Sequence, residues 1–380
     1  MRTPIVTSLA CAACLALAPA ARPVPAPDAG KPIDLVICLD TSNSMDGLID
    51  SAKIKLWDIV NDLAKVKPTP VLRVALYSYG NDGYDKDAGW VRKELDLTTD
   101  LDEVYRKLNA LTTHGGTEYV GRVSRDALEQ VRWSKDRDAL KIIFVCGNEG
   151  AEQDPLVKLE ELAGKAAAQG VIINTIYCGP AKDGIAPGWY RFAELAGGKG
   201  VNIDQEQARK EAHVKSPYDE KLLKLSNELN KTYLAYGARG AEGKMNQEAQ
   251  DANAAAAAPQ AALARAGTKA SCLYNCPTWD LCDRLKTDPK FDITKLTDEE
   301  LPEEMRKLKP GERKAYIEKK LKEREAIQKE VLELNKKREE FVREEIKKLP
   351  PNAAERAFDD AVRGLLRVQC AGKGFEVPQE

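Results

Sequence analysis

The stretch Leu35-Val-Ile-Cys-Leu-Asp-Thr-Ser-Asn-Ser-Met45 is a short apolar run that ends abruptly in polar residues. An apolar run of this length, with Pro32 before it, predicts a buried central strand. Asp40, Ser42 and Ser44 follow at alternating positions where the strand passes into a loop, so their oxygens can turn toward one point. Such oxygens suit a hard cation such as magnesium. The same residues are also ordinary turn formers and helix caps, so this stretch alone leaves both interpretations open.

Strand-like apolar runs alternate with segments of helical periodicity from about residue 33 to residue 204. The strands are predicted at 35–39, 71–79, 91–97, 140–146, 171–178 and 200–203, with helices between them at 48–65, 101–110, 118–132, 155–169 and 188–196. This alternation is typical of an α/β fold with a doubly wound, mostly parallel sheet. Ligands of such sheets bind outside the carboxyl ends of the strands, which is where Asp40 lies.

A second motif, Gly115-Gly-Thr-Glu118, lies in a predicted loop between two helices. Together with D-x-S-x-S after the first strand and the strand order around both motifs, it resembles the von Willebrand factor type A (VWA) domain. The resemblance covers roughly residues 33–204 and implies a Rossmann-like fold with a metal-ion-dependent adhesion site (MIDAS). It also implies which residues hold the ion, directly or through water: Asp40, Ser42, Ser44 and Thr117.

One position departs from the family. Members carry Asp-Gly directly after the fourth strand, whereas this chain reads Phe144-Val-Cys-Gly-Asn-Glu-Gly150, with Gly147 or Asn148 in place of the acid. Asn148 is therefore a fifth, weaker candidate ligand. Losing one carboxylate removes much of what draws a hard ion out of water. Two interpretations stay open: a working site for Mg²⁺, with Mn²⁺ or Ca²⁺ as alternatives, or a vestigial site. The sequence does not show whether Glu149 or Asp154 replaces the missing acid.

The functional class that the resemblance implies is a protein-binding module of the adhesion type. In such modules the ion keeps one coordination position open, and an Asp or Glu side chain of a partner protein completes its shell. The alternative is a structural or scaffolding protein of the cell envelope, with an empty site and contacts made by a long charged helix. The sequence determines neither the partner nor the oligomeric state.

Other functional classes have little support. The chain contains no G-x-S-x-G, H-E-x-x-H, G-K-[ST] or G-x-G-x-x-G motif and only two histidines, so we expect no enzyme. Its 58 basic and 60 acidic residues nearly balance, and no overall field favours nucleic acid or an anionic membrane.

The first twenty residues resemble an export signal. Arg2, the apolar run from Ile5 to Leu17 and Ala18-Pro-Ala20 match a secretory signal peptide with an A-x-A cleavage site. The apolar run is shorter than the roughly 20 residues of a membrane span, and no later segment is apolar enough to cross a bilayer. We expect residues 1–20 to be removed, residues 21–32 to form a Pro/Ala-rich linker, and the protein to be periplasmic or extracellular.

The remaining region, residues 205–380, is predicted to be mainly helical. Its segments are helices at 218–230, 247–266 (broken at Pro259) and 354–368, and a strand-like run at 233–236. From Gly311 to Leu349 a highly charged stretch has apolar residues at spacings of three, four and seven, which predicts one long helix. Charged residues at many heptad positions disfavour a regular two-stranded coiled coil, so we expect this helix to pack on neighbouring helices.

Seven cysteines follow the predicted cleavage site. Three of them end apolar runs and are expected to be small buried residues: Cys38, Cys146 and Cys178. The other four are candidates for disulfides in an exported protein: Cys272, Cys276, Cys282 and Cys370. A zinc site is disfavoured, because there is no C-x-x-C pair and no histidine beside these cysteines.

Overall fold

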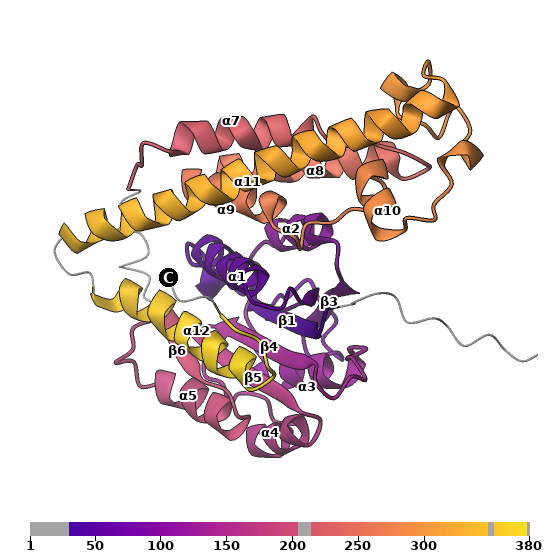
Figure 1. The fold of residues 1–380 in the computed structure, drawn as a ribbon. Helices are drawn as coiled ribbons and strands as arrows, with labels where there is room; N and C mark the ends of the chain where they lie inside the picture. Colours follow the sequence, from indigo (N-terminus) through magenta and orange to yellow (C-terminus); the bar gives the residue numbers. More distant parts are fainter. Residues whose placement is uncertain (1–29, 204–213, 349–352, 378–380) are drawn as a thin grey trace, which may run out of the picture.

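The computed structural model describes residues 30–203, 214–348 and 353–377. It shows a central sheet with helices on both faces and, on one side of this α/β unit, a further layer of helices (Figure 1). The predicted signal peptide lies outside the described residues, so export stays a prediction. Within the described residues, no helix combines the length and the hydropathy that a membrane span requires.

Six strands form the sheet, in the spatial order β3-β2-β1-β4-β5-β6. They span Pro32–Asp40 (β1), Val71–Tyr79 (β2), Val91–Thr98 (β3), Leu140–Gly147 (β4), Val171–Cys178 (β5) and Gly200–Ile203 (β6). All neighbouring pairs are parallel except β2 and β3, which are antiparallel. The predicted doubly wound, mostly parallel sheet is confirmed. Because the chain winds outward in opposite directions from β1 and β4, their carboxyl ends form the switch point where open sheets bind ligands.

Helices cover both faces of the sheet. One face carries α1 (Ile49–Ala64), α2 (Leu101–Asn109) and α12 (Ala353–Ala371), and the other carries α3 (Val120–Gln130), α4 (Leu159–Ala168) and α5 (Ala186–Leu195). Side chains alternate along each strand. In β1, Leu35 and Ile37 therefore pack toward α1 while Val36 and Cys38 pack toward α3. Burial on both faces explains why β1 is an unbroken apolar run.

The helix α12 comes from the end of the chain and returns to the sheet beside β6 (Figure 1). Leu365 and Leu366 are buried in the same apolar cluster as Val201 and Ile203 of β6. A further β-bridge joins Lys67 to Glu376. The predicted domain limit at residue 204 stays a prediction, but the core of the α/β unit also includes residues from 353–377. A helical pattern in sequence does not reveal the surface on which the helix packs.

The helical layer lies between β6 and α12 in the sequence. Its helices are α7 (Asp219–Asn230), α8 (Gly240–Ala257), α9 (Pro259–Ala270), α10 (Leu281–Thr287) and α11 (Pro310–Lys348), with short 3-10 helices at Ile293–Lys295 and Glu303–Met305. The Ala-rich stretch forms two helices that meet at Ala258, where Pro259 starts the second. The strand-like run at 233–236 is not a strand, because only an isolated bridge links Ala235 to Asp280.

The longest helix, α11, has 39 residues and packs on α7, α9 and α10. Ile317 and Val331 are fully buried along it, whereas most of its Lys and Glu side chains are not. The narrow apolar stripe of α11 therefore packs against other helices of this chain.

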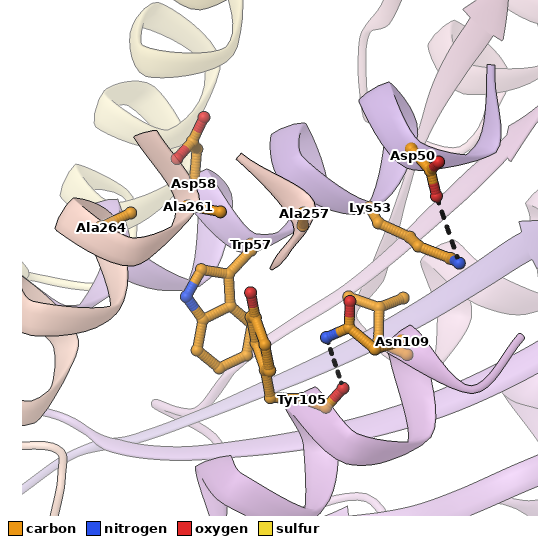
Figure 2. A pocket seen from close by; sticks show the side chains of 10 residues that line it. Asp50, Lys53, Trp57, Asp58, Tyr105, Asn109, Ala257, Ala261 and Ala264 are labelled. Carbon is orange, nitrogen blue, oxygen red and sulfur yellow. Dashed lines mark hydrogen bonds and ion pairs between the residues drawn. The ribbon is translucent and has the colours of Figure 1, made fainter. Parts of the chain in front are cut away.

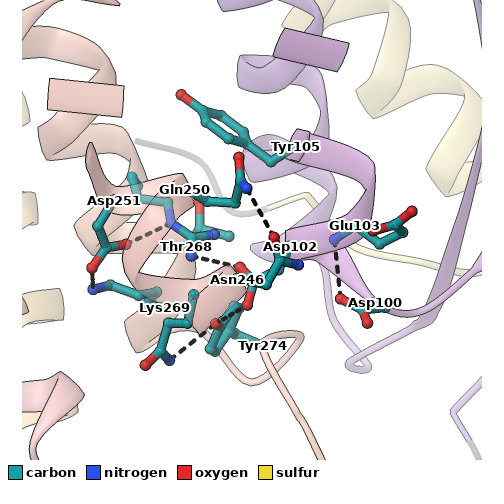
Figure 3. Close-up of polar contacts among 12 residues, drawn as sticks. Asp100, Asp102, Glu103, Tyr105, Asn246, Gln250, Asp251, Thr268, Lys269 and Tyr274 are labelled. Carbon is teal, nitrogen blue, oxygen red and sulfur yellow. Dashed lines mark hydrogen bonds and ion pairs between the residues drawn. The ribbon is translucent and has the colours of Figure 1, made fainter. Parts of the chain in front are cut away.

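A buried network of charges joins the helical layer to the α/β unit (Figure 3). Arg265 of α9 lies 2.5 Å from Asp102 at the start of α2 and 2.9 Å from Asp251 of α8. Lys269 also pairs with Asp251, and Tyr274 donates a hydrogen bond to Asp102. Burial lowers the pKa of Lys269 to about 8, although Asp251 opposes this shift. Two carboxylates face two cations here, which is the arrangement that buried charges need.

The cysteine prediction is corrected in one respect. All seven described cysteines are free thiols, so the four candidates for disulfides at 272, 276, 282 and 370 form none. Cys276, Cys282 and Cys370 are buried as separate small side chains, and Cys272 is exposed. Close sulfur contact occurs instead between Cys146 and Cys178 on neighbouring strands, with Sγ atoms 3.3 Å apart.

Replacing Leu366 by alanine should lower the free energy of unfolding by about 2–5 kcal/mol, because it removes a buried side chain between α12 and the sheet. Val368 on the same helix is 72% exposed, so Val368→Ala should change it by less than about 0.5 kcal/mol. Urea unfolding followed by circular dichroism measures both. Equally small losses would show that α12 does not contribute to the core in solution.

Candidate functional site

The candidate site is centred on Asp40, the last residue of β1, at the switch point of the sheet. Parallel pairing places Asp40 beside Tyr79 of β2 and the preceding Leu39 beside Cys146 of β4. Asp40 is 1% exposed. The backbone N–H of Ser42 donates to its Oδ1 at 2.8 Å, while its Oδ2 accepts no hydrogen bond of ordinary geometry within the described residues. A buried carboxylate oxygen without a partner is unusual and needs a physical explanation.

The two serines and Asn148 lie next to each other beside Asp40. A 3-10 turn at Asn43–Met45 follows β1 and brings the Oγ atoms of Ser42 and Ser44 to 2.8 Å. Ser44 donates to Oδ1 of Asn148 at 3.0 Å. Neighbouring ligands of an octahedral magnesium ion, each about 2.1 Å from it, lie about 3 Å apart. Four of the five predicted ligands are therefore brought together at spacings that such an ion accepts.

The fifth predicted ligand, Thr117, lies on the loop between α2 and α3. Two backbone hydrogen bonds tie this loop to the one after β1: His114 N–H donates to Thr41 at 2.9 Å, and Asn43 N–H donates to Gly115 at 2.6 Å. The Thr117 side chain is half-buried, and no hydrogen bond from its hydroxyl is found within the described residues. The structure places its loop at the site without joining its hydroxyl to the other candidate ligands.

Gly147 ends β4 directly against Asp40. A Cβ atom at this position would lie 2.9 Å from Oδ2 of Asp40 and would collide with the hydroxyl of Tyr79. That hydroxyl donates to the carbonyl of Cys146 at 3.2 Å. A side chain at 147 would therefore point at Asp40, but tyrosine fills the space that it would need.

Glu149 and Asp154, the two acids considered as substitutes for the missing acid after β4, do not take its place in the structure. Asp154 is buried in an ion pair with Arg122, at 3.0 and 3.1 Å, which holds it away from the serines. Glu149 is half-buried, and its backbone carbonyl accepts a hydrogen bond from Trp189. In this structure a tertiary ion pair therefore uses the Asp154 carboxylate.

Glu118 is the residue at this site that the sequence interpretation missed. It is 7% exposed, and its Cγ atom borders the same space beside Gly80 as Asp40 Oδ1 and Ser42 Cβ. Burial first, and then the charge of Glu118, raise the pKa of Asp40 to about 7. Burial and the charge of Glu149 raise the pKa of Glu118 as well. The sequence feature that could have identified Glu118 is its position directly after Thr117 in the second motif.

A separate cleft of about 130 Å³ lies between α1, α2 and the Ala-rich helices (Figure 2). The rings of Trp57 and Tyr105, with centroids 4.7 Å apart, line it together with alanines such as Ala261. None of the predicted ligands lines this cleft. It therefore forms no part of the candidate site at the strand ends.

The composition of the candidate site differs from that of a cluster of acids or of cysteines. Within the parts of the chain that the structure describes, no three His, Cys, Asp or Glu residues are grouped so that they could hold a metal ion. The candidate set instead combines carboxylates with two hydroxyls and an amide.

A family model described as von Willebrand factor type A domain matches residues 34–184. No curated protein matches the chain. Solved structures that are similar include proximal thread matrix protein 1 from the mussel byssus with a zinc-occupied MIDAS motif (13% identity, TM-score 0.37, 48% of this chain and 44% of that one). Others are a von Willebrand factor type A structure from Catenulispora acidiphila (16%, 0.35, 47% and 40%) and the pilus adhesin SpaC from Lactobacillus rhamnosus GG (12%, 0.36, 48% and 29%). The matched part spans less than half of each of these three proteins.

Proposed function

We propose, from the von Willebrand factor type A domain that residues 34–184 form, that this chain is an exported protein-binding module. In this proposal a divalent ion at the switch point binds a carboxylate of a partner protein. The observation that carries it is a pair of serine hydroxyls 2.8 Å apart beside Asp40, whose buried Oδ2 accepts no hydrogen bond of ordinary geometry within the described residues.

The residues present fit a hard divalent ion. Oxygen donors of one carboxylate, two hydroxyls and an amide suit Mg²⁺, which keeps some of its waters. Gly80 and Gly147 leave both oxygens of Asp40 uncovered: a Cβ atom would lie 2.8 Å from Oδ1 at the first and 2.9 Å from Oδ2 at the second. Side chains at either position would fill this space. Glycine at these two positions therefore keeps further side-chain atoms away from both carboxylate oxygens.

Each residue has a distinct role in this proposal. Asp40 would supply charge from a fixed position, because the backbone N–H of Ser42 orients it. Ser42 and Ser44 would supply neutral oxygens that leave the charge of the ion largely uncompensated. The bound ion would supply an electrophilic position that a partner's carboxylate completes. Thr117 could contribute its hydroxyl from the adjoining loop.

The first expected result is that millimolar Mg²⁺ raises the melting temperature of the protein by a few degrees, and that Asp40→Asn abolishes the effect. An ion that binds only the folded state stabilises it by RT ln(1 + [L]/Kd), about 2.7 kcal/mol at a hundredfold excess over Kd. Asp50→Asn is a matched control, since the Asp50 side chain is 85% exposed on α1. A shift that survives Asp40→Asn would place the ion elsewhere.

Partner binding is tested by capture from envelope extract on the immobilised protein, with Mg²⁺ and then with a chelator. The proposal expects a protein that is retained with metal, released by chelator and not retained by Asp40→Asn. If the partner is retained without metal and also by Asp40→Asn, the scaffolding alternative is favoured. The contacts would then be made by surfaces such as the charged outer side of α11.

A further inference from the structure

We propose that Glu118 supplies the second carboxylate of the metal site, in place of the acid that is missing after β4. This inference rests on the metal-binding function proposed above. It adds a residue that the family resemblance does not include, since that resemblance assigns the loop before α3 only through Thr117.

The surroundings of Gly80 and Gly116 show where the Glu118 side chain lies. A Cβ atom on Gly80 would lie 2.8 Å from Asp40 Oδ1, 3.0 Å from Glu118 Cγ and 3.5 Å from Ser42 Cβ. A Cβ atom on Gly116 would lie 2.9 Å from Glu118 Oε1. The Glu118 side chain therefore lies between Gly116 and the space beside Asp40 and Ser42, and it does not extend into solvent.

Hydroxyl protons are too few for the oxygens at this site. Ser44 donates its proton to Oδ1 of Asn148, so the 2.8 Å contact between the two serine Oγ atoms uses the proton of Ser42. Neither hydroxyl then has a proton left for Asp40, and Oδ2 of Asp40 accepts no hydrogen bond of ordinary geometry within the described residues. A cation beside these oxygens would satisfy them.

Charge leads to the same conclusion. Asp40 and Glu118 are both buried, and neither forms an ion pair with a lysine or arginine among the described residues. The nearby Arg122 is already bidentate to Asp154. Buried carboxylates are normally paired or bound to metal, and two neighbouring ones repel each other. A divalent ion would neutralise both.

The position after β4 is closed to a carboxylate by Tyr79, as described above for Gly147. Placing the second acid on the loop before α3 keeps two negative charges at the site while the tyrosine stays in the core. The ion would then link the loop after β1 with the loop before α3.

The test is calorimetric titration of the mature protein with Mn²⁺ and with Mg²⁺, for the parent, Glu118→Gln, Glu118→Asp and Asp40→Asn. Glu118→Gln should weaken binding by about tenfold or more, because it removes one charge from the ion's surroundings. Glu118→Asp keeps the charge and should retain part of the affinity. Asp50→Asn is the matched control: it removes a carboxylate that is 85% exposed on α1 and should leave binding close to that of the parent.

Melting in chelator separates binding from structure. There Glu118→Gln should melt at or above the parent temperature, because it relieves repulsion with Asp40. Glu118→Gln with parental affinity, beside an inactive Asp40→Asn, would overturn the role of Glu118 and leave the metal site intact. Glu118→Asp as weak as Glu118→Gln would also overturn it, because charge would then not matter. Failure of the parent to bind either ion would overturn the proposed function itself.

Discussion

Replacing Arg324 by methionine is expected to lower the free energy of unfolding by about 3–5 kcal/mol. The guanidinium of Arg324 lies 2.7 Å from Asp280 and 2.9 Å from Asp283, and its side chain is 3% exposed. It also stacks 3.8 Å above the ring centroid of Tyr233 and donates to the carbonyl of Thr232 at 2.8 Å. Methionine fills similar volume but leaves two carboxylates buried without a cation. Urea unfolding at pH 7 measures the loss.

The loss should depend on pH in a defined direction. Burial, and then the charge of Asp280, already raise the pKa of Asp283 from 3.8 to about 6, although Arg324 opposes this. Below pH 3.8 the carboxyl is protonated in both states, whereas between 3.8 and 6 the folded state binds more protons. Stability is therefore lost as the pH rises through about 6. Without Arg324 this effect grows, so the deficit of the variant should be larger at pH 7 than at pH 5.

A control for Arg324→Met is Arg191→Met. Arg191 pairs with Glu160 at 3.1 Å, but both side chains are more than half exposed. An exposed pair of this kind contributes about 0–1 kcal/mol. Similar losses for the two variants, or a deficit of Arg324→Met that does not change between pH 5 and 7, would contradict a buried charge cluster.

The second large effect concerns Asn148. Asn148→Asp should tighten Mg²⁺ binding by about tenfold or more, because two unit charges 4 Å apart interact by about 4 kcal/mol at an effective dielectric of 20, before desolvation is subtracted. The new carboxylate can keep the hydrogen bond that Ser44 now donates to Oδ1. In chelator the same variant should melt lower than the parent, because another negative charge then faces Asp40 and Glu118. Calorimetric titration and melting in Mg²⁺ and in chelator measure the two opposite effects.

Two further variants make this prediction specific to one position. Asn43→Asp adds the same charge on an exposed side chain of the neighbouring loop after β1 and should gain much less affinity. Gly147→Asp should be destabilised with or without metal, because its Cβ atom would collide with the Tyr79 hydroxyl. The sequence alone left open whether Gly147 or Asn148 replaces the missing acid. Equal gains from Asn148→Asp and Asn43→Asp would show that only the local charge matters, and would exclude Asn148 as a ligand.

Local patterns in the sequence were sufficient for the α/β fold and for the centre of the candidate site. An unbroken apolar run such as Leu35–Leu39, bounded by Pro32 and Asp40, favours a strand buried on both faces, and the alternation with helical segments favours parallel pairing through crossovers. Parallel strands present their carboxyl ends at one edge, so Asp40, Ser42 and Asn148 had to come close once the fold was known. These inferences depend on neighbours within a few residues and on one rule of topology.

Only the tertiary structure determined which other side chains reach Asp40. Glu118 lies in the space beside Asp40 and Ser42, whereas Asp154 is held away by Arg122. The position of α12 on the sheet likewise depends on partners far away in sequence, since its apolar face would fit other surfaces equally well. Periodicity shows that a residue is buried, but not what covers it. Contacts between distant segments depend on the shapes and charges of both partners, and a pattern within one segment describes only one of them.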